Sequence, residues 1–178
     1  EMAQRALTIK KIAVAGAKNG YGDYYMAIGN IYEIKGDYST AMKYHNESLQ
    51  LKIRSFGEKG PFQAASLAAI GRIYAKTGDY ERAEEFYNRA LNMVNGTIGR
   101  KSRIYISLMH KIAVVNAKAG DFNKAYDAMQ VALEAARDKY TKAHPKYARV
   151  LYRMGRLELW AGAPQSALTS LQEAMDLC

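Results

Sequence analysis

Four glycines at a constant interval of 42 residues constrain the fold of this chain more than any other feature. They are Gly36, Gly78, Gly120 and Gly162. The clearest copy of the surrounding signal is Tyr74-Ala-Lys-Thr-Gly-Asp-Tyr-Glu-Arg-Ala83, and the most divergent is residues 158–167. A fixed period that recurs without insertion predicts a solenoid of stacked structural units.

The residues around each glycine predict a helix, a tight turn and a second helix. Glycine suits the left-handed position at which a helix stops. Asp37, Asp79 and Asp121 follow the first three glycines and suit the N-cap of the next helix. In the fourth copy Ala163 lacks a capping side chain, but Pro164 is a favourable first helical residue.

Small residues recur at the same offsets in every copy and predict two helices packed at short range. In the second helix they are Ala41, Ala83, Ala125 and Ala167, with Ser48, Ala90, Ala132 and Ala174 seven residues later. In the first helix they are Gly29, Gly71, Ala113 and Gly155. We expect helix pairs near 23–35 and 38–56, 62–77 and 80–96, 103–119 and 122–140, and 146–161 and 164–177. Residues 1–18 are expected to be the second helix of a preceding repeat.

This pattern resembles the tetratricopeptide repeat. The positions that match it at every offset are Gly71, Tyr74, Gly78, Tyr80, Ala83, Tyr87 and Ala90. The usual repeat has about 34 residues, and the longer period here resembles the kinesin-light-chain-type subclass. The segment 143–148 is similar to the linker between repeats of that subclass. The resemblance implies an all-α, right-handed superhelical solenoid of antiparallel helix hairpins. We expect one domain over 1–178, with repeats at 22–58, 61–98, 103–140 and 145–178.

Composition bounds the compartment. Apolar residues make up 49% of the chain, but no run of eighteen apolar residues suggests a membrane span. No charged-then-apolar leader marks secretion, and the single cysteine, Cys178, excludes an internal disulfide. We therefore expect an intracellular, cytoplasmic protein without membrane contact. A start at Glu1 and an end without a polar capping helix favour an excerpt of a longer protein.

No pattern of catalytic or metal-binding residues emerges. His45, His110 and His144 belong to three different repeats at unrelated offsets, without ligands at a metal-binding spacing. His45 occupies the repeat position filled elsewhere by large core residues, so we expect a satisfied core histidine. The glycines are explained by helix ends, which leaves no phosphate-binding loop. We expect a protein that is not an enzyme and that holds no metal and no cofactor.

Positive charge is concentrated in one part of the chain. Residues 100–156 hold 13 basic and 4 acidic residues, whereas residues 1–99 hold 13 and 10. Residues 157–178 hold no basic and 3 acidic residues. This block indicates an acidic partner for the third and fourth repeats. A basic surface that only maintains solubility is the other interpretation.

The resemblance also implies a concave groove lined by the first helix of each hairpin. The candidate partner-binding residues on that lining are Asn30, Arg72, Lys76, His110, Lys111, Lys118, Arg149, Tyr152, Arg153, Arg156 and Trp160. Cations beside small apolar residues suit an acidic or acidic-apolar segment of a protein partner. The paired Asn slots of kinesin-light-chain repeats hold other residues here, for example Met26 and Ala27, so cargo specificity does not carry over. Asn30 and Arg72 only partly match a chaperone-type carboxylate clamp, and Glu33 would repel a ligand carboxylate.

Several alternatives stay open. Trp160 could anchor a ligand or pack against a following repeat. The basic block with its tyrosines could bind the phosphates and bases of a nucleic acid, although no residue-per-base pattern is present. Self-association through the terminal helices is a third possibility.

Overall fold

The computed structural model describes residues 21–57, 60–141 and 144–177. The helix expected over residues 1–18 lies outside these ranges. The chain divides into two compact units between Met93 and Val94, and each unit is described by itself. The single domain expected over 1–178 therefore stays a prediction.

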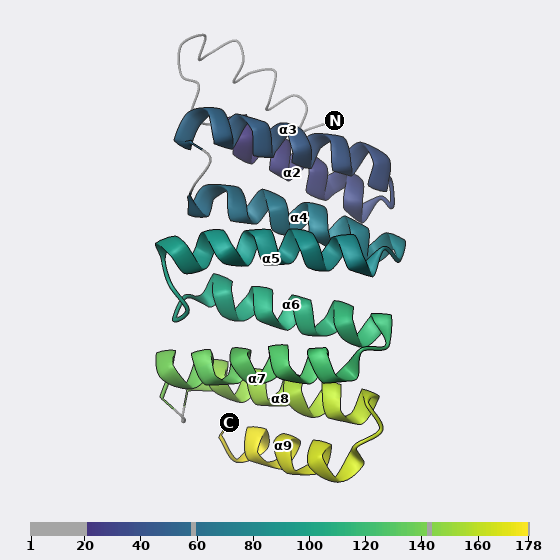
Figure 1. The fold of residues 1–178 in the computed structure, drawn as a ribbon, viewed down its shortest axis with the longest axis vertical. Coiled ribbons are helices and arrows are strands. Elements are labelled where there is room, and N and C mark those ends of the chain that lie inside the picture. Colours follow the sequence, from purple (N-terminus) through teal and green to yellow (C-terminus); the bar gives the residue numbers. More distant parts are fainter. Residues whose placement is uncertain (1–20, 58–59, 142–143, 178) are drawn as a thin grey trace. The chain divides into compact units, whose positions relative to one another are not determined.

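The described residues form eight α-helices and no strand (Figure 1). In order they are α2 (Tyr21–Ile34), α3 (Tyr38–Phe56), α4 (Pro61–Thr77), α5 (Tyr80–Thr97), α6 (Arg103–Ala119), α7 (Phe122–Lys139), α8 (Pro145–Trp160) and α9 (Pro164–Asp176). Each bound lies within two residues of its predicted position. No helix in the described part of the chain is long and apolar enough to span a membrane.

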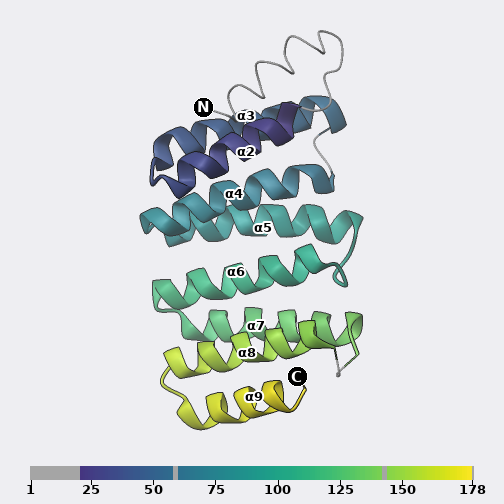
Figure 2. The ribbon, with the colours of Figure 1, turned by 180° about the vertical axis from the view of Figure 1, so that it is seen from behind.

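The turns within the hairpins have the predicted chemistry. Gly78 ends α4 in the left-handed conformation, with φ of 87°, and Gly120 does the same for α6 at 90°. The Asp121 carboxylate then accepts a hydrogen bond of 3.0 Å from the Lys124 backbone N–H. Ala163 makes no such bond, and α9 begins at Pro164. Figure 2 shows each turn closing a pair of helices.

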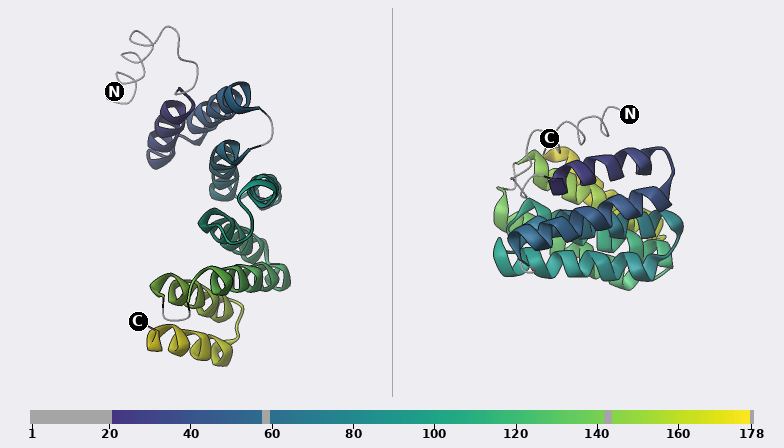
Figure 3. Two further views of the ribbon diagram at one scale, coloured as in Figure 1. Left: turned by 90° about the vertical axis from the view of Figure 1, so that its left-hand side faces the viewer. Right: turned by 90° about the horizontal axis from the view of Figure 1, so that it is seen from above.

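The two helices of a hairpin pack closely at the predicted small residues. Ala41, Ala83 and Ala125 are completely buried. A methyl group built on Gly71 would lie 3.0 Å from the Tyr87 ring, and one on Gly155 would lie 2.7 Å from Leu171 Cγ. Glycine at these positions therefore lets a large side chain of the second helix fill the space. Figure 3 shows the paired helices from two further directions.

Candidate partner-binding site

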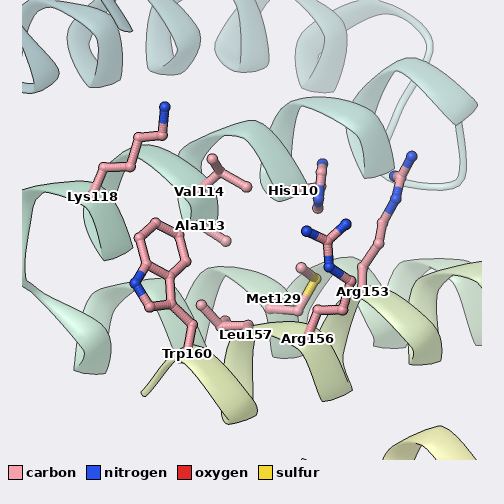
Figure 4. Close-up of a pocket in the computed structure, with 9 residues that line it drawn as sticks. All are labelled: His110, Ala113, Val114, Lys118, Met129, Arg153, Arg156, Leu157 and Trp160. Atoms are coloured by element: carbon pink, nitrogen blue, oxygen red, sulfur yellow. The ribbon is translucent and has the colours of Figure 1, made fainter. Parts of the chain in front are cut away.

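A pocket of about 360 Å³ lies in the second unit between α6, α7 and α8. Its lining combines an apolar surface with three cationic side chains. The lining residues are His110, Ala113, Val114, Lys118, Met129, Arg153, Arg156, Leu157 and Trp160 (Figure 4). Five of them, His110, Lys118, Arg153, Arg156 and Trp160, belong to the predicted site.

Trp160 and the group of His110, Arg153 and Arg156 stand at opposite ends of the pocket, and Lys118 lies on the Trp160 side (Figure 4). Figure 4 shows the indole of Trp160 at one end and His110 with the two guanidinium groups at the other. Trp160 is 50% exposed, and its ring packs edge-on against Phe122 of α7 with centroids 6.1 Å apart. Trp160 at the end of α8 therefore contacts the preceding helix of the same unit, while half of its surface stays exposed.

The electrostatics of the pocket favour an anion. No carboxylate is among the described residues that line it. Burial lowers the pKa of His110 to about 4, and the charges of Arg153, Lys111 and Arg156 act in the same direction. His110 is therefore neutral near pH 7. Burial and the neighbouring Arg149 also lower the pKa of Arg153, as expected where cations crowd without a counter-charge.

A smaller hollow of about 100 Å³ lies beside the pocket in the same unit. It is lined by Arg103, Ile106, Ser107, Tyr140, Lys146, Arg149, Val150 and Arg153. Arg153 lines both cavities. The hollow therefore continues the basic surface from α8 toward the start of α6.

The predicted residues of the first unit have a different role. Arg72 of α4 donates hydrogen bonds of 2.6–2.9 Å to the Glu33 carboxylate and one of 2.8 Å to Asn30 Oδ1. Lys76 Nζ lies 3.2 Å from Glu33 Oε1. Burial raises the pKa of Glu33, but the hydrogen bonds and charges of Arg72 and Lys76 outweigh it, so the pKa is lowered overall. The negative charge of Glu33 is thus compensated by Arg72 and Lys76 and is not free to repel a ligand. These two cations already bind a carboxylate of the protein itself.

His45 departs from the expected satisfied histidine. Its side chain is completely buried, and neither ring nitrogen has a hydrogen-bond partner among the described residues. Glu33 Oε2 is 3.9 Å from Nε2, beyond hydrogen-bond distance. The repeat period correctly predicted that His45 lies in the core, but it did not predict that the ring nitrogens would lack a hydrogen-bond partner among the described residues.

Two predicted residues of the second unit, Lys111 and Tyr152, line neither the pocket nor the smaller hollow. Tyr152 is exposed, with the Arg156 guanidinium 5.9 Å from its ring centre, and Lys111 is half-buried on α6. Sequence reasoning missed Met129 and Leu157, which help to form the apolar floor. Met129 occupies the core position of its repeat, and it also lines the pocket beside the small residue Ala113. The repeat pattern places Met129 and Ala113 at positions that pack inside a hairpin. Periodicity alone does not show that these two residues also line a pocket.

Metal chemistry finds no support in the described residues. No three His, Cys, Asp or Glu side chains of residues 21–57, 60–141 and 144–177 gather closely enough to hold a metal ion.

Comparison with known proteins identifies the architecture. The tetratricopeptide repeat model matches residues 20–95 and 105–178. No curated protein matches the chain significantly. Among solved structures, BtubC (BKLC) from P. vanneervenii is similar with a TM-score of 0.82 and 18% identity, over 98% of this chain and 70% of that one. A Podosopora anserina protein of nearly identical TPR-like repeats, described as a putative kinesin light chain, has a TM-score of 0.79 and 14% identity, over 98% and 83%. RapI in its apo form has a TM-score of 0.77 and 15% identity, over 97% and 62%.

These matches cover both units, and the described residues form all-α hairpins like those of the matched repeat proteins. Tetratricopeptide repeats generally mediate protein–protein interactions as non-enzymatic scaffolds. The chain therefore belongs to the tetratricopeptide repeat family, as a helical repeat solenoid of the kinesin-light-chain-like kind.

Proposed function

We propose that this chain is a non-enzymatic interaction module that binds an acidic segment of a partner protein through the pocket between α6, α7 and α8. One observation carries the proposal. The pocket places an apolar floor beside Lys118, Arg153 and Arg156, and no carboxylate of the described residues lines it. A ligand that complements both features has an apolar side chain flanked by acidic ones.

The apolar part of the pocket suits an anchor side chain. Val114 and Trp160 line it beside the floor that Leu157 helps to form (Figure 4). A volume of about 360 Å³ falls in the range of cavities that bind small ligands or single large side chains. Trp and Arg side chains are enriched among the residues that carry most of the binding energy at interfaces.

The cationic side chains give the site a positive charge. Guanidinium groups such as those of Arg153 and Arg156 hold carboxylates through paired hydrogen bonds. The neutral imidazole of His110 adds hydrogen-bonding capacity without further charge. In the first unit Arg72 and Lys76 already hold Glu33, so the proposal centres on the second unit.

A fluorescence titration tests this proposal, because Trp160 is the only tryptophan of the chain. The probes are nine-residue peptides with a central Leu or Phe between glutamates, the same peptides with a central Ser, and the same peptides with lysines for glutamates. A twelve-residue oligothymidylate is the nucleic-acid probe. We expect a saturable change in Trp160 emission only with the peptides that are both acidic and apolar.

A matched pair of variants locates the binding. Arg153→Gln/Arg156→Gln should weaken binding of the acidic-apolar peptides at least about tenfold. Lys101→Gln/Arg137→Gln removes the same charge from exposed positions that line neither cavity and should change affinity less than about threefold at 0.15 M salt. Equal binding of acidic and basic peptides would sink the proposal. Tighter binding of the oligonucleotide would move the function to nucleic acid.

A further inference from the structure

The small hollow beside the pocket holds an unusual group of charges. Four cationic residues line it together with Ser107: Arg103, Lys146, Arg149 and Arg153. No carboxylate among the described residues lines the hollow with them. The arrangement contrasts with the first unit, where two cations converge on the buried Glu33 carboxylate.

The backbone adds to the positive potential. Arg103 is the first residue of α6, and Lys146 is the second residue of α8. The first turn of a helix carries the positive end of its macrodipole, where acidic side chains are favourable and cations are not. Arg103 and Lys146 are therefore repelled by the positive ends of their helix dipoles, which raises the free energy of the unliganded protein. A bound anion would offset this repulsion.

The geometry points to a phosphate-monoester site in this hollow, which takes a phosphorylated side chain of the same partner segment that enters the neighbouring pocket. This assignment rests on the proposed function for the identity of the partner. A carboxylate carries one charge and two acceptor oxygens, whereas a phosphate monoester carries about −1.5 to −2 and three acceptor oxygens. Three arginines and a lysine around one small hollow match the larger charge.

Arg153 connects the two cavities. Its side chain lines both the pocket and the hollow, so an anchor side chain and a phosphorylated side chain of one segment would share it. Arg103, Lys146 and Arg149 line only the hollow. Substitutions at these three positions therefore separate phosphate recognition from anchor binding.

An NMR titration tests the phosphate assignment without knowledge of the partner. The probe is N-acetyl-O-phosphoserine amide, followed through the arginine Nε–Hε signals and the Ser107 amide. N-acetylglutamate amide and dimethyl phosphate serve as the carboxylate and phosphodiester comparisons. We expect shifts confined to the hollow and an affinity at least about tenfold higher for the phosphoserine compound than for either comparison.

The variant Arg103→Gln/Arg149→Gln should weaken phosphoserine binding at least about tenfold, and the surface pair Lys101→Gln/Arg137→Gln should change it less than about threefold. Folding should survive, because loss of a cation at the start of α6 relieves its unfavourable position. Lys146→Gln alone is a second variant with the same expected direction. Unchanged binding in both hollow variants would overturn the assignment, as would equal affinity for dimethyl phosphate.

A final arm separates the two proposals. Phosphoserine placed in turn at each position flanking the anchor of the acidic-apolar peptide should raise affinity at one position at least, and Arg103→Gln/Arg149→Gln should remove that gain alone. If anchor peptides bind and no phosphoserine position raises affinity, only the phosphate assignment fails. If no anchor peptide binds but the phosphoserine compound still shifts the hollow, the proposed pocket fails and the partner-segment part of this inference fails with it. Tighter binding of oligothymidylate than of the phosphoserine compound would assign the hollow to nucleic acid.

Discussion

His45 shows how a single glycine shapes the core of a hairpin. A methyl group on Gly29 would lie 2.6 Å from the imidazole, so only glycine leaves room for the ring. Burial lowers the pKa of His45 to about 4, the charge of Arg72 acts in the same direction, and the nearby Glu33 opposes it. The ring therefore stays neutral inside the first unit at physiological pH.

A pH dependence of stability follows. The unfolded chain protonates His45 near pH 6.5 and the folded chain only near 4, so the unfolded state binds more protons between these values. The stabilisation is complete above pH 6.5 and is lost as the pH falls. Between pH 7 and pH 5, His45 should remove about 2 kcal/mol from the free energy of unfolding. His45→Met, which places at this position the residue that Met129 supplies in the third repeat, should abolish that part.

Urea unfolding at both pH values measures this difference. Wild type and variant both keep His110, whose contribution cancels in the comparison. A variant that loses as much stability as wild type between pH 7 and pH 5 would mean that His45 takes up a proton in the folded state.

At the scale of the helix, two glycines make opposite predictions. A methyl group on Gly71 of α4 would meet the Tyr87 ring at 3.0 Å and the Ala83 carbonyl oxygen at 3.1 Å, whereas Gly96 of α5 has nothing within 4 Å. Gly71→Ala should destabilise the protein by about 1–2 kcal/mol, because crowding exceeds the gain in helix propensity. Gly96→Ala should stabilise it by up to about 1 kcal/mol. Urea midpoints compare the two, and stabilisation by both would contradict close packing at Gly71.

The helices could be predicted because their signals are local. Left-handed glycines, Asp N-caps and small residues at a fixed period are all legible in sequence, and the observed helix bounds follow them closely. Contacts between neighbouring hairpins could not be predicted from the sequence. The partner of Glu33 is Arg72, which lies on the first helix of the next hairpin. A repeat comparison aligns equivalent positions, but it does not show which unlike side chains meet across the stack.

For the molecule as a whole, the distribution of charge was a stronger guide than periodicity to the cations that line the two cavities. The block 100–156, with 13 basic and 4 acidic residues, contains all the cations of both cavities. The charge block pointed to the third and fourth repeats, but the list of candidate residues also included Arg72 and Lys76 of the first unit beside Arg153 of the second. The buried Glu33 distinguishes the two units, because it already holds the cations that the periodic pattern would offer to a ligand.

The same charge block should govern how fast an acidic segment associates. Long-range attraction is screened within about 10 Å at 0.1 M salt, so the association rate constant for an acidic-apolar peptide should fall about tenfold between roughly 50 and 300 mM salt. Arg153→Gln/Arg156→Gln and Lys101→Gln/Arg137→Gln remove equal charge and should slow association similarly at low salt. Only the first pair should speed dissociation, since only those side chains line the pocket. Stopped-flow fluorescence of Trp160 resolves both rates, and equal dissociation rates for the two variants would show that Arg153 and Arg156 steer the ligand without contacting it.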